Sequence, residues 1–133
     1  MILVDSNVWI DFFNQRKTPA NVELIALLQD GNATVAVADL VVFEVLRGFT
    51  SEKERQVAKR LLLTLELVEI GGWDAAVEAT EHYVQLRARG YTIASPIDVL
   101  LASYCITHDH LLLHRDADFD VMKTLRGLKA WSQ

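Results

Sequence analysis

The stretch Met1-Ile2-Leu3-Val4-Asp5-Ser6-Asn7 opens the chain and decides its fold. Its first four residues are apolar and end abruptly at an acid, a pattern typical of a buried strand with a polar group at its carboxyl end. Carboxylates are almost never fully buried unless they are paired or bind a metal. Asp5 therefore needs a partner, and other segments of the chain supply candidates.

Three further acids interrupt or border apolar segments in the same way: Glu44 after Leu40-Val41-Val42-Phe43, Asp98 before Val99-Leu100-Leu101, and Asp116 after Leu111-Leu112-Leu113-His114-Arg115. A divalent cation is the simplest common reason for acids on core-forming segments. A site of carboxylate oxygens without cysteines or paired histidines suits Mg²⁺ or Mn²⁺ and not Zn²⁺. The nearby histidines follow no zinc-ligand spacing and are expected at the surface: His108, His110 and His114.

Length and composition predict one domain over residues 1–133 with a substantial core, because 51% of its 133 residues are hydrophobic. No apolar run is long enough for a membrane span and the chain opens without a basic leader, so we expect a cytoplasmic protein. The net charge of −5 argues against a broad basic surface for nucleic acid. It does not exclude a nuclease, since acids gathered at a metal site account for most of the excess. The single cysteine, Cys105, is expected to be a buried free thiol.

Short apolar strands alternate with helical segments along the whole chain. Strands are predicted at Ile2–Asp5, Ala33–Ala38, Leu67–Ile70, Leu111–His114 and Leu128–Trp131. Helices are predicted at Asn7–Asn14, Pro19–Gln29, Leu40–Arg47, Glu52–Leu65, Asp74–Arg89, Pro96–His108 and Ala117–Arg126. This order is typical of an α/β fold: an α/β/α sandwich around a mostly parallel five-stranded sheet.

The predicted fold brings the four acids toward one place. In a parallel α/β sheet, ligands bind outside the carboxyl ends of the strands. Asp5 and Asp116 follow the first and fourth predicted strands, and Asp98 lies in the first turn of a helix that begins on that side. Glu44 lies one helical turn after Leu40 and so faces the same way.

Most of these acids also have a purely structural interpretation. Asp98 could close a capping box with Ser95, and Glu44 could be the buried partner of Arg47. Asp116 could cap the helix that follows it. Asp5 is the hardest to explain in this way, because the next two residues are better placed to cap the first helix.

Four motifs in order resemble the PIN-domain nucleases and, among these, the VapC toxins of toxin-antitoxin systems. They are Asp5-Ser6-Asn7 after an apolar strand, Phe43-Glu44-Val45-Leu46-Arg47-Gly48, Pro96-Ile97-Asp98-Val99-Leu100-Leu101-Ala102, and His114-Arg115-Asp116-Ala117-Asp118-Phe119. The resemblance extends from Met1 to about Trp131. It departs from the family pattern at Ser95-Pro96-Ile97, where small residues are more usual, and at Ser6, where threonine is commoner, but neither departure removes an acid.

The resemblance implies a Mg²⁺- or Mn²⁺-dependent endoribonuclease with Asp5, Glu44, Asp98 and Asp116 as its catalytic and metal-binding acids. Asp118 matches a position that is often acidic and would be a further or water-mediated ligand. Ser6 would match the hydroxyl residue that follows the first acid, and Asn7 a residue that braces the site. The implied partners are an RNA substrate, a VapB-like antitoxin and a second copy of the chain in a homodimer.

Three other functions remain open from the residues. A phospho-receiver domain would need an acceptor aspartate after the third strand, where this chain has Glu69-Ile70-Gly71-Gly72. A haloacid-dehalogenase-type phosphatase would need a second aspartate at position 7, which is Asn7. The non-enzymatic alternative is a degenerate PIN domain that acts as a scaffold for RNA or protein, and retention of all four acids argues against it.

Overall fold

A parallel sheet of four strands forms the centre of the protein, whose computed structural model describes residues 1–131. The strands are β1 (Ile2–Val4), β2 (Val35–Ala38), β3 (Glu66–Val68) and β4 (Leu111–Leu113), in the spatial order β3-β2-β1-β4. All neighbouring pairs are parallel, which confirms the predicted sheet type. Residues 132 and 133 of the predicted domain lie outside the described residues.

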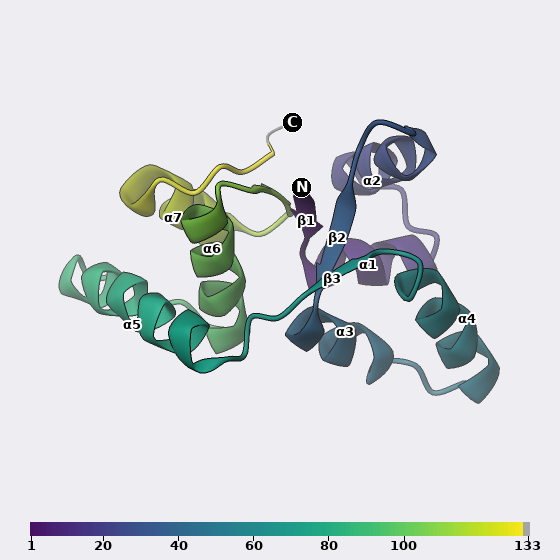
Figure 1. The fold of residues 1–133 in the computed structure, drawn as a ribbon, viewed down its shortest axis with the longest axis horizontal. Coiled ribbons are helices and arrows are strands. Elements are labelled where there is room, and N and C mark those ends of the chain that lie inside the picture. Colours follow the sequence, from purple (N-terminus) through teal and green to yellow (C-terminus); the bar gives the residue numbers. More distant parts are fainter. Residues whose placement is uncertain (132–133) are drawn as a thin grey trace.

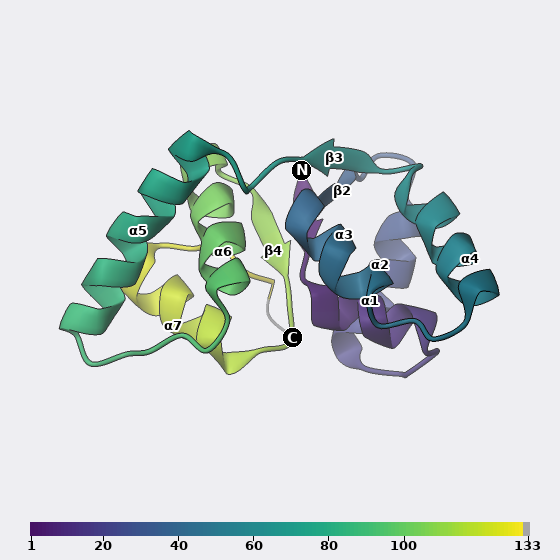
Figure 2. The same cartoon turned by 90° about the horizontal axis from the view of Figure 1, so that it is seen from below.

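Two groups of helices flank the sheet (Figure 1). The first group is α1 (Ser6–Phe13), α2 (Pro19–Gln29), α3 (Asp39–Leu46) and α4 (Glu52–Leu62). The second group, on the opposite side, is α5 (Trp73–Ala88), α6 (Pro96–His108) and α7 (Ala117–Arg126). The turned view keeps the two groups apart with the strands between them (Figure 2). The predicted helices are thus all present, with ends that differ from the predictions by a few residues.

The predicted fifth strand is wrong. Within Leu128–Trp131, only Ala130 forms a bridge, which is parallel and pairs with Leu112 of β4. Two backbone hydrogen bonds of 2.9 Å hold it, from Leu112 N–H to the Lys129 carbonyl and from Trp131 N–H to the Leu112 carbonyl. Because the segment pairs with β4, itself only three residues long, through Ala130 alone, it covers the outer edge of β4 without adding a strand.

Local sequence signals explain where several helices begin and end. The Thr18 hydroxyl accepts a hydrogen bond from Asn21 N–H at 3.1 Å, and Pro19 follows at the first helical position of α2. The Ser51 hydroxyl likewise accepts from Glu54 N–H at 3.3 Å at the start of α4. Helix α7 ends at Gly127, whose φ of 77° lies in the left-handed region that favours glycine.

The register of the sheet places the ends of β1 and β4 side by side. Val4 is aligned with Leu113, and Asp5 N–H donates to the Leu113 carbonyl at 3.0 Å. Leu3, Val4, Leu112 and Leu113 are completely buried, so this edge is anchored in the core. The first residues beyond the two strands therefore start from a rigid platform.

Two smaller expectations concern the rest of the chain. Cys105 is a buried free thiol, as predicted, and burial raises its pKa to about 12. Within residues 1–131, no helix combines the length and the apolar character that crossing a membrane requires.

Candidate metal centre

The acids predicted from the sequence come from four different parts of the fold. Asp5 directly follows β1 and is 1% exposed, and Glu44 lies in the last turn of α3 and is half-buried. Asp98 is in the first turn of α6 and is 8% exposed. Asp116 stands at the start of α7 with Asp118 two residues further on, both half-buried. Each acid is therefore held by regular backbone, either just after a strand, within a helix or at the start of one.

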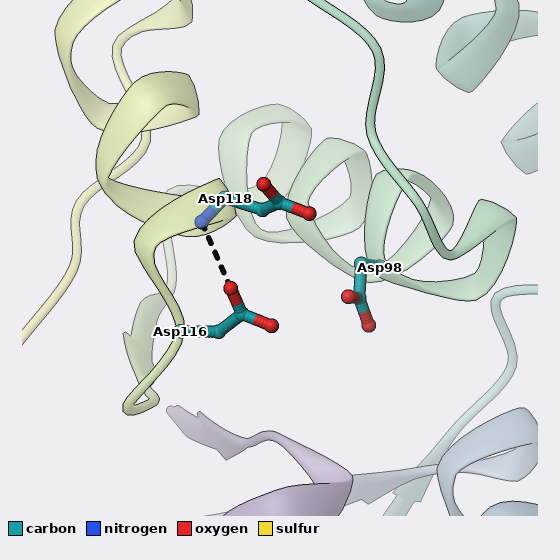
Figure 3. A group of neighbouring side chains, drawn as sticks. All are labelled: Asp98, Asp116 and Asp118. Carbon is teal, nitrogen blue, oxygen red and sulfur yellow. Dashed lines mark hydrogen bonds between the residues drawn. The ribbon is translucent and has the colours of Figure 1, made fainter.

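Three of these acids form a tight group (Figure 3). Each of Asp98, Asp116 and Asp118 offers a carboxylate oxygen, and these oxygens all lie within 4.8 Å of one another. The group is organised by the backbone, because Asp118 N–H donates to Asp116 Oδ1 at 2.9 Å. Asp116 therefore caps α7 with one oxygen, and its other oxygen accepts no hydrogen bond from residues 1–131.

Electrostatic effects connect Asp5 and Glu44 to the same group. The pKa of Asp5 is raised to about 6. Burial is the largest cause, and the charges of Glu44 and Asp116 contribute, although the backbone N–H groups of Ser6 and Asn7 act against this. Burial also raises the pKa of Asp98 to about 7, assisted by repulsion from Asp5, Glu44, Asp116 and Asp118. The five acids thus share one electrostatic environment.

No cation balances this charge in the part of the chain that the structure describes. None of the five acids forms an ion pair within residues 1–131. Moreover, Asp5 Oδ1 and Glu44 Oε1 are buried without a hydrogen-bond partner. Buried polar atoms without partners are rare and costly, and here they are oxygens, the atoms that Mg²⁺ and Mn²⁺ prefer. The residues therefore fit a hard divalent cation.

The structural alternatives for these acids are only partly realised. Ser95 is at the N-cap of α6 but makes no side-chain capping bond, so no capping box explains Asp98. The Arg47 guanidinium lies 5.2 Å from the centre of the Phe43 ring and forms no ion pair with Glu44. Only the capping role of Asp116 is real, and it occupies one of its two oxygens.

Helix α1 differs from the prediction at its start, since it begins at Ser6 with Asp5 in the N-cap position. The Asp5 side chain makes no capping hydrogen bond there. Ser6 is buried in the first turn and Asn7 is half-buried, and both lie next to the acid in the chain. Their proposed roles as orienting residues stay predictions.

One histidine was misjudged from the sequence. His114 is 5% exposed, not a surface side chain, and burial lowers its pKa. Its Nδ1 accepts a hydrogen bond from Asp116 N–H at 3.1 Å, so the neutral ring fixes the backbone of an acid in the cluster. The three leucines of β4 that precede His114 gave no sign of this role, because a residue at a strand end can be either exposed or buried.

Sequence reasoning also missed Asp11, a buried acid in α1 that contacts Arg115. The signal was present in the sequence. Asp11 interrupts the apolar run Val8-Trp9-Ile10 and Phe12-Phe13 just as Glu44 interrupts its own segment. A carboxylate in such an apolar segment needs a partner for the same reason as the other four acids.

Comparison with known proteins identifies the family of the chain. The model of the PIN domain family matches residues 2–125. The chain is 32% identical over 135 residues to the VapC ribonuclease Mb1587 of Mycobacterium bovis and to the ribonuclease VapC11 of Mycobacterium tuberculosis, with 99% of this chain and 98% of each relative covered. Its fold is similar to a chain in the crystal structure of VapBC2 from Rickettsia felis bound to a promoter DNA fragment, with a TM-score of 0.77, 20% identity and 98% of both chains covered. The protein therefore belongs to the PIN-domain family and, within it, to the VapC ribonucleases.

Proposed function

We propose that this protein is a Mg²⁺- or Mn²⁺-dependent endoribonuclease that acts as the toxin of a toxin-antitoxin pair. The observation that carries this proposal is the group of acids at the carboxyl edge of the sheet, which has unpartnered buried oxygens and forms no ion pair with a basic side chain among the described residues. A scaffold that bound RNA without cleaving it would gain nothing from such a destabilising cluster. The acids are consequently assigned to the reaction.

Asp5, Glu44, Asp98 and Asp116 are the proposed catalytic acids and would hold the cation, with Asp118 as a further ligand. When bound, the cation lowers the pKa of a water molecule and stabilises charge on the scissile phosphate. A carboxyl group binds a cation in its deprotonated form, so the raised pKa values of Asp5, about 6, and Asp98, about 7, mean that cation binding releases protons near and below these pH values. Hydrolysis by water leaves a 5′ phosphate and a 3′ hydroxyl, and Ser6 is assigned an orienting role.

A cleavage assay tests this proposal directly. Purified protein is incubated with total RNA in Mg²⁺, Mn²⁺ or EDTA, and the ends of the fragments are mapped. We expect cleavage only with a divalent cation, with 5′ phosphates on the products. Asp98→Asn should be inactive, and Asp30→Ala, which changes an exposed acid at the end of α2, should cleave normally. RNA that is bound but left intact by the unmutated protein would favour the scaffold.

The proposed partners are a VapB-like antitoxin and a second copy of the chain. We also propose that residues 1–133 form a single domain and that the protein acts in the cytoplasm. Support comes from large apolar side chains exposed on or directly after helices of the first group: Val22, Ile25, Phe43, Val57 and, at the C-cap of α4, Leu63. A cavity of about 200 Å³ between α3, α4 and β3 has an apolar lining that includes Val42, Leu46 and Leu62. Such surfaces are typical of sites that pack against another chain.

Light scattering tests the homodimer, and co-expression tests the antitoxin. At high micromolar concentration we expect twice the monomer mass, and a strictly monomeric species would contradict the dimer. Expression of the chain alone should arrest bacterial growth. Co-expression of the neighbouring open reading frame should relieve the arrest, and continued arrest would exclude that frame as the antitoxin.

A further inference from the structure

Asp11 is a second fully buried carboxylate near the carboxyl edge of the sheet. It lies in α1 and is 1% exposed. Arg115 Nε donates to Asp11 Oδ2 at 2.5 Å, and Arg115 Nη2 donates to Oδ1 at 3.4 Å. Arg16 Nη1 lies 3.6 Å from the same Oδ1. The buried charge of Asp11 is therefore compensated by two guanidinium groups, unlike the charge of the acid cluster.

Arg115 occupies a special place in the chain, since it directly precedes Asp116 in the connection from β4 to α7. Its contact with Asp11 joins residues that are 104 positions apart. Helix α1 begins next to Asp5, so the Asp11–Arg115 pair ties the helix after one acid to the loop that carries another. His114 Nδ1 holds the Asp116 backbone from the other side of Arg115 at 3.1 Å.

The pair also controls where a positive charge lies. A guanidinium group readily forms two parallel hydrogen bonds with a carboxylate, and Arg115 is the sequence neighbour of a cluster acid. Without Asp11, the Arg115 side chain, which is 41% exposed, would be free to turn toward those acids. An arginine there would neutralise the charge that a metal ion needs and would pull Asp116 out of place.

We propose that Asp11 is a positioning residue of the metal site: it holds Arg115 away from the acids and fixes the β4–α7 connection so that Asp116 and Asp118 face Asp98. This rests on the proposed function, because it assumes that the acids bind a cation. Asp11 is assigned no contact with the cation or the RNA. Its effect passes through Arg115 to the neighbouring acids.

The test is Mn²⁺ binding to the RNA-free protein by isothermal titration calorimetry. We expect Asp11→Asn and Arg115→Gln each to weaken Mn²⁺ binding about 10- to 100-fold, the usual effect of residues that orient metal ligands. The double variant should bind Mn²⁺ no more weakly than the single variant with the lower affinity, because both changes break the same Asp11–Arg115 contact. Arg16→Gln is the matched control. This variant removes a positive charge near the same carboxylate, but Arg16 lies outside the β4–α7 connection that carries Asp116. Its affinity for Mn²⁺ should therefore change less than about 3-fold.

Asp98→Asn separates failure of this proposal from failure of the proposed function. If Asp98→Asn binds Mn²⁺ as the unmutated protein does, the metal site itself is wrong and Asp11 has nothing to position. If Asp98→Asn loses binding while Asp11→Asn and Arg115→Gln keep it, only the positioning role is overturned. Fully additive losses in the double variant would also overturn it.

A second measurement distinguishes positioning from a general loss of fold. RNA cleavage by Arg115→Gln is followed as Mn²⁺ is raised, with folding checked by circular dichroism. We expect the half-saturating Mn²⁺ concentration to rise about 10-fold or more, and most of the rate to return at saturation. A folded variant with unchanged half-saturation and a lower maximal rate would contradict the proposal.

Discussion

Two buried carboxylates six positions apart, Asp5 and Asp11, have opposite surroundings. Both are 1% exposed, and both lie at or in helix α1. Asp11 faces two arginines, whereas Asp5 faces other acids and leaves Oδ1 without a partner. Burial alone therefore does not distinguish a structural acid from a metal-binding one. The partners support the proposed distinction, because a buried charge without a basic partner is costly unless an ion compensates it.

The largest expected effect is on catalysis. Asp5→Ala should reduce RNA cleavage by more than about 100-fold, because losing a direct ligand displaces the cation and so costs more than losing a residue that only orients one. Glu44→Ala, Asp98→Ala and Asp116→Ala should behave alike, and combining them should not multiply the losses. The measurement is the initial rate of cleavage with Asp30→Ala as control. Equal rates for Asp5→Ala and Asp30→Ala would show that Asp5 has no catalytic role and would remove the proposed difference between Asp5 and Asp11.

The next effect is on stability, where the two buried acids should respond with opposite signs. In EDTA at pH 8, Asp11→Asn should lower the free energy of unfolding by about 2 kcal/mol, because it weakens charged hydrogen bonds from Arg115. Asp5→Asn should instead raise it by about 1 to 2 kcal/mol, because a neutral amide removes the cost of burying the Asp5 charge and the repulsion from Glu44 and Asp116. Urea unfolding measures both. A loss of stability in both variants would mean that the metal-free cluster is not strained.

The pH dependence sharpens the same contrast. The pKa of Asp5 is raised from 3.8 to about 6 and that of Asp98 to about 7, so the folded protein holds protons that the unfolded chain releases. Their stabilising contribution is complete below about pH 4 and is lost as the pH rises through about 7. In EDTA, the contribution of these groups to the free energy of unfolding should therefore fall as the pH rises from 4 to 7, by a few kcal/mol at most.

Chemical denaturation across this pH range measures that slope. The double variant with Asp5→Asn and Asp98→Asn should show a flatter profile, because neither amide titrates. Saturating Mn²⁺ should also offset the loss at pH 7 and above. An identical slope in the double variant would assign the pH dependence to other groups.

Asp118 should have a smaller effect on catalysis than the four principal acids. It is half-buried, and its own backbone N–H binds Asp116 whether or not its side chain is present. Asp118→Ala should therefore reduce cleavage by about 10- to 100-fold. The initial rate at saturating Mn²⁺ is the appropriate measurement. A loss as large as that of Asp5→Ala would promote Asp118 to a principal ligand.

The smallest effect belongs to Arg16. It lies 3.6 Å from Asp11 with a side chain that is 62% exposed, so solvent screens the contact. Arg16→Gln should change the free energy of unfolding by less than about 1 kcal/mol. Thermal unfolding of Arg16→Gln and Asp11→Asn side by side checks this. A loss of stability in Arg16→Gln as large as that in Asp11→Asn would show that Arg16, and not only Arg115, compensates the buried charge of Asp11.

Most of the fold could be predicted because local signals agree with one another. Pro19 after Thr18, the Ser51 cap and the apolar strands each point to elements that the structure contains. The fifth strand failed because an apolar segment near the end of a chain reads as a strand whether or not a partner edge has free length. The structure decides it, because the segment pairs with the three-residue strand β4 through Ala130 alone.

The sequence by itself determined the kind of site: acids at the ends of apolar segments, in an order that places them on one edge of a parallel sheet. Those properties depend on periodicity and chain direction, which are local. The tertiary structure alone decided which acid receives an internal cation. Asp11 and Arg115 meet across 104 positions because β1 and β4 are neighbours in register, and no local pattern encodes that neighbourhood.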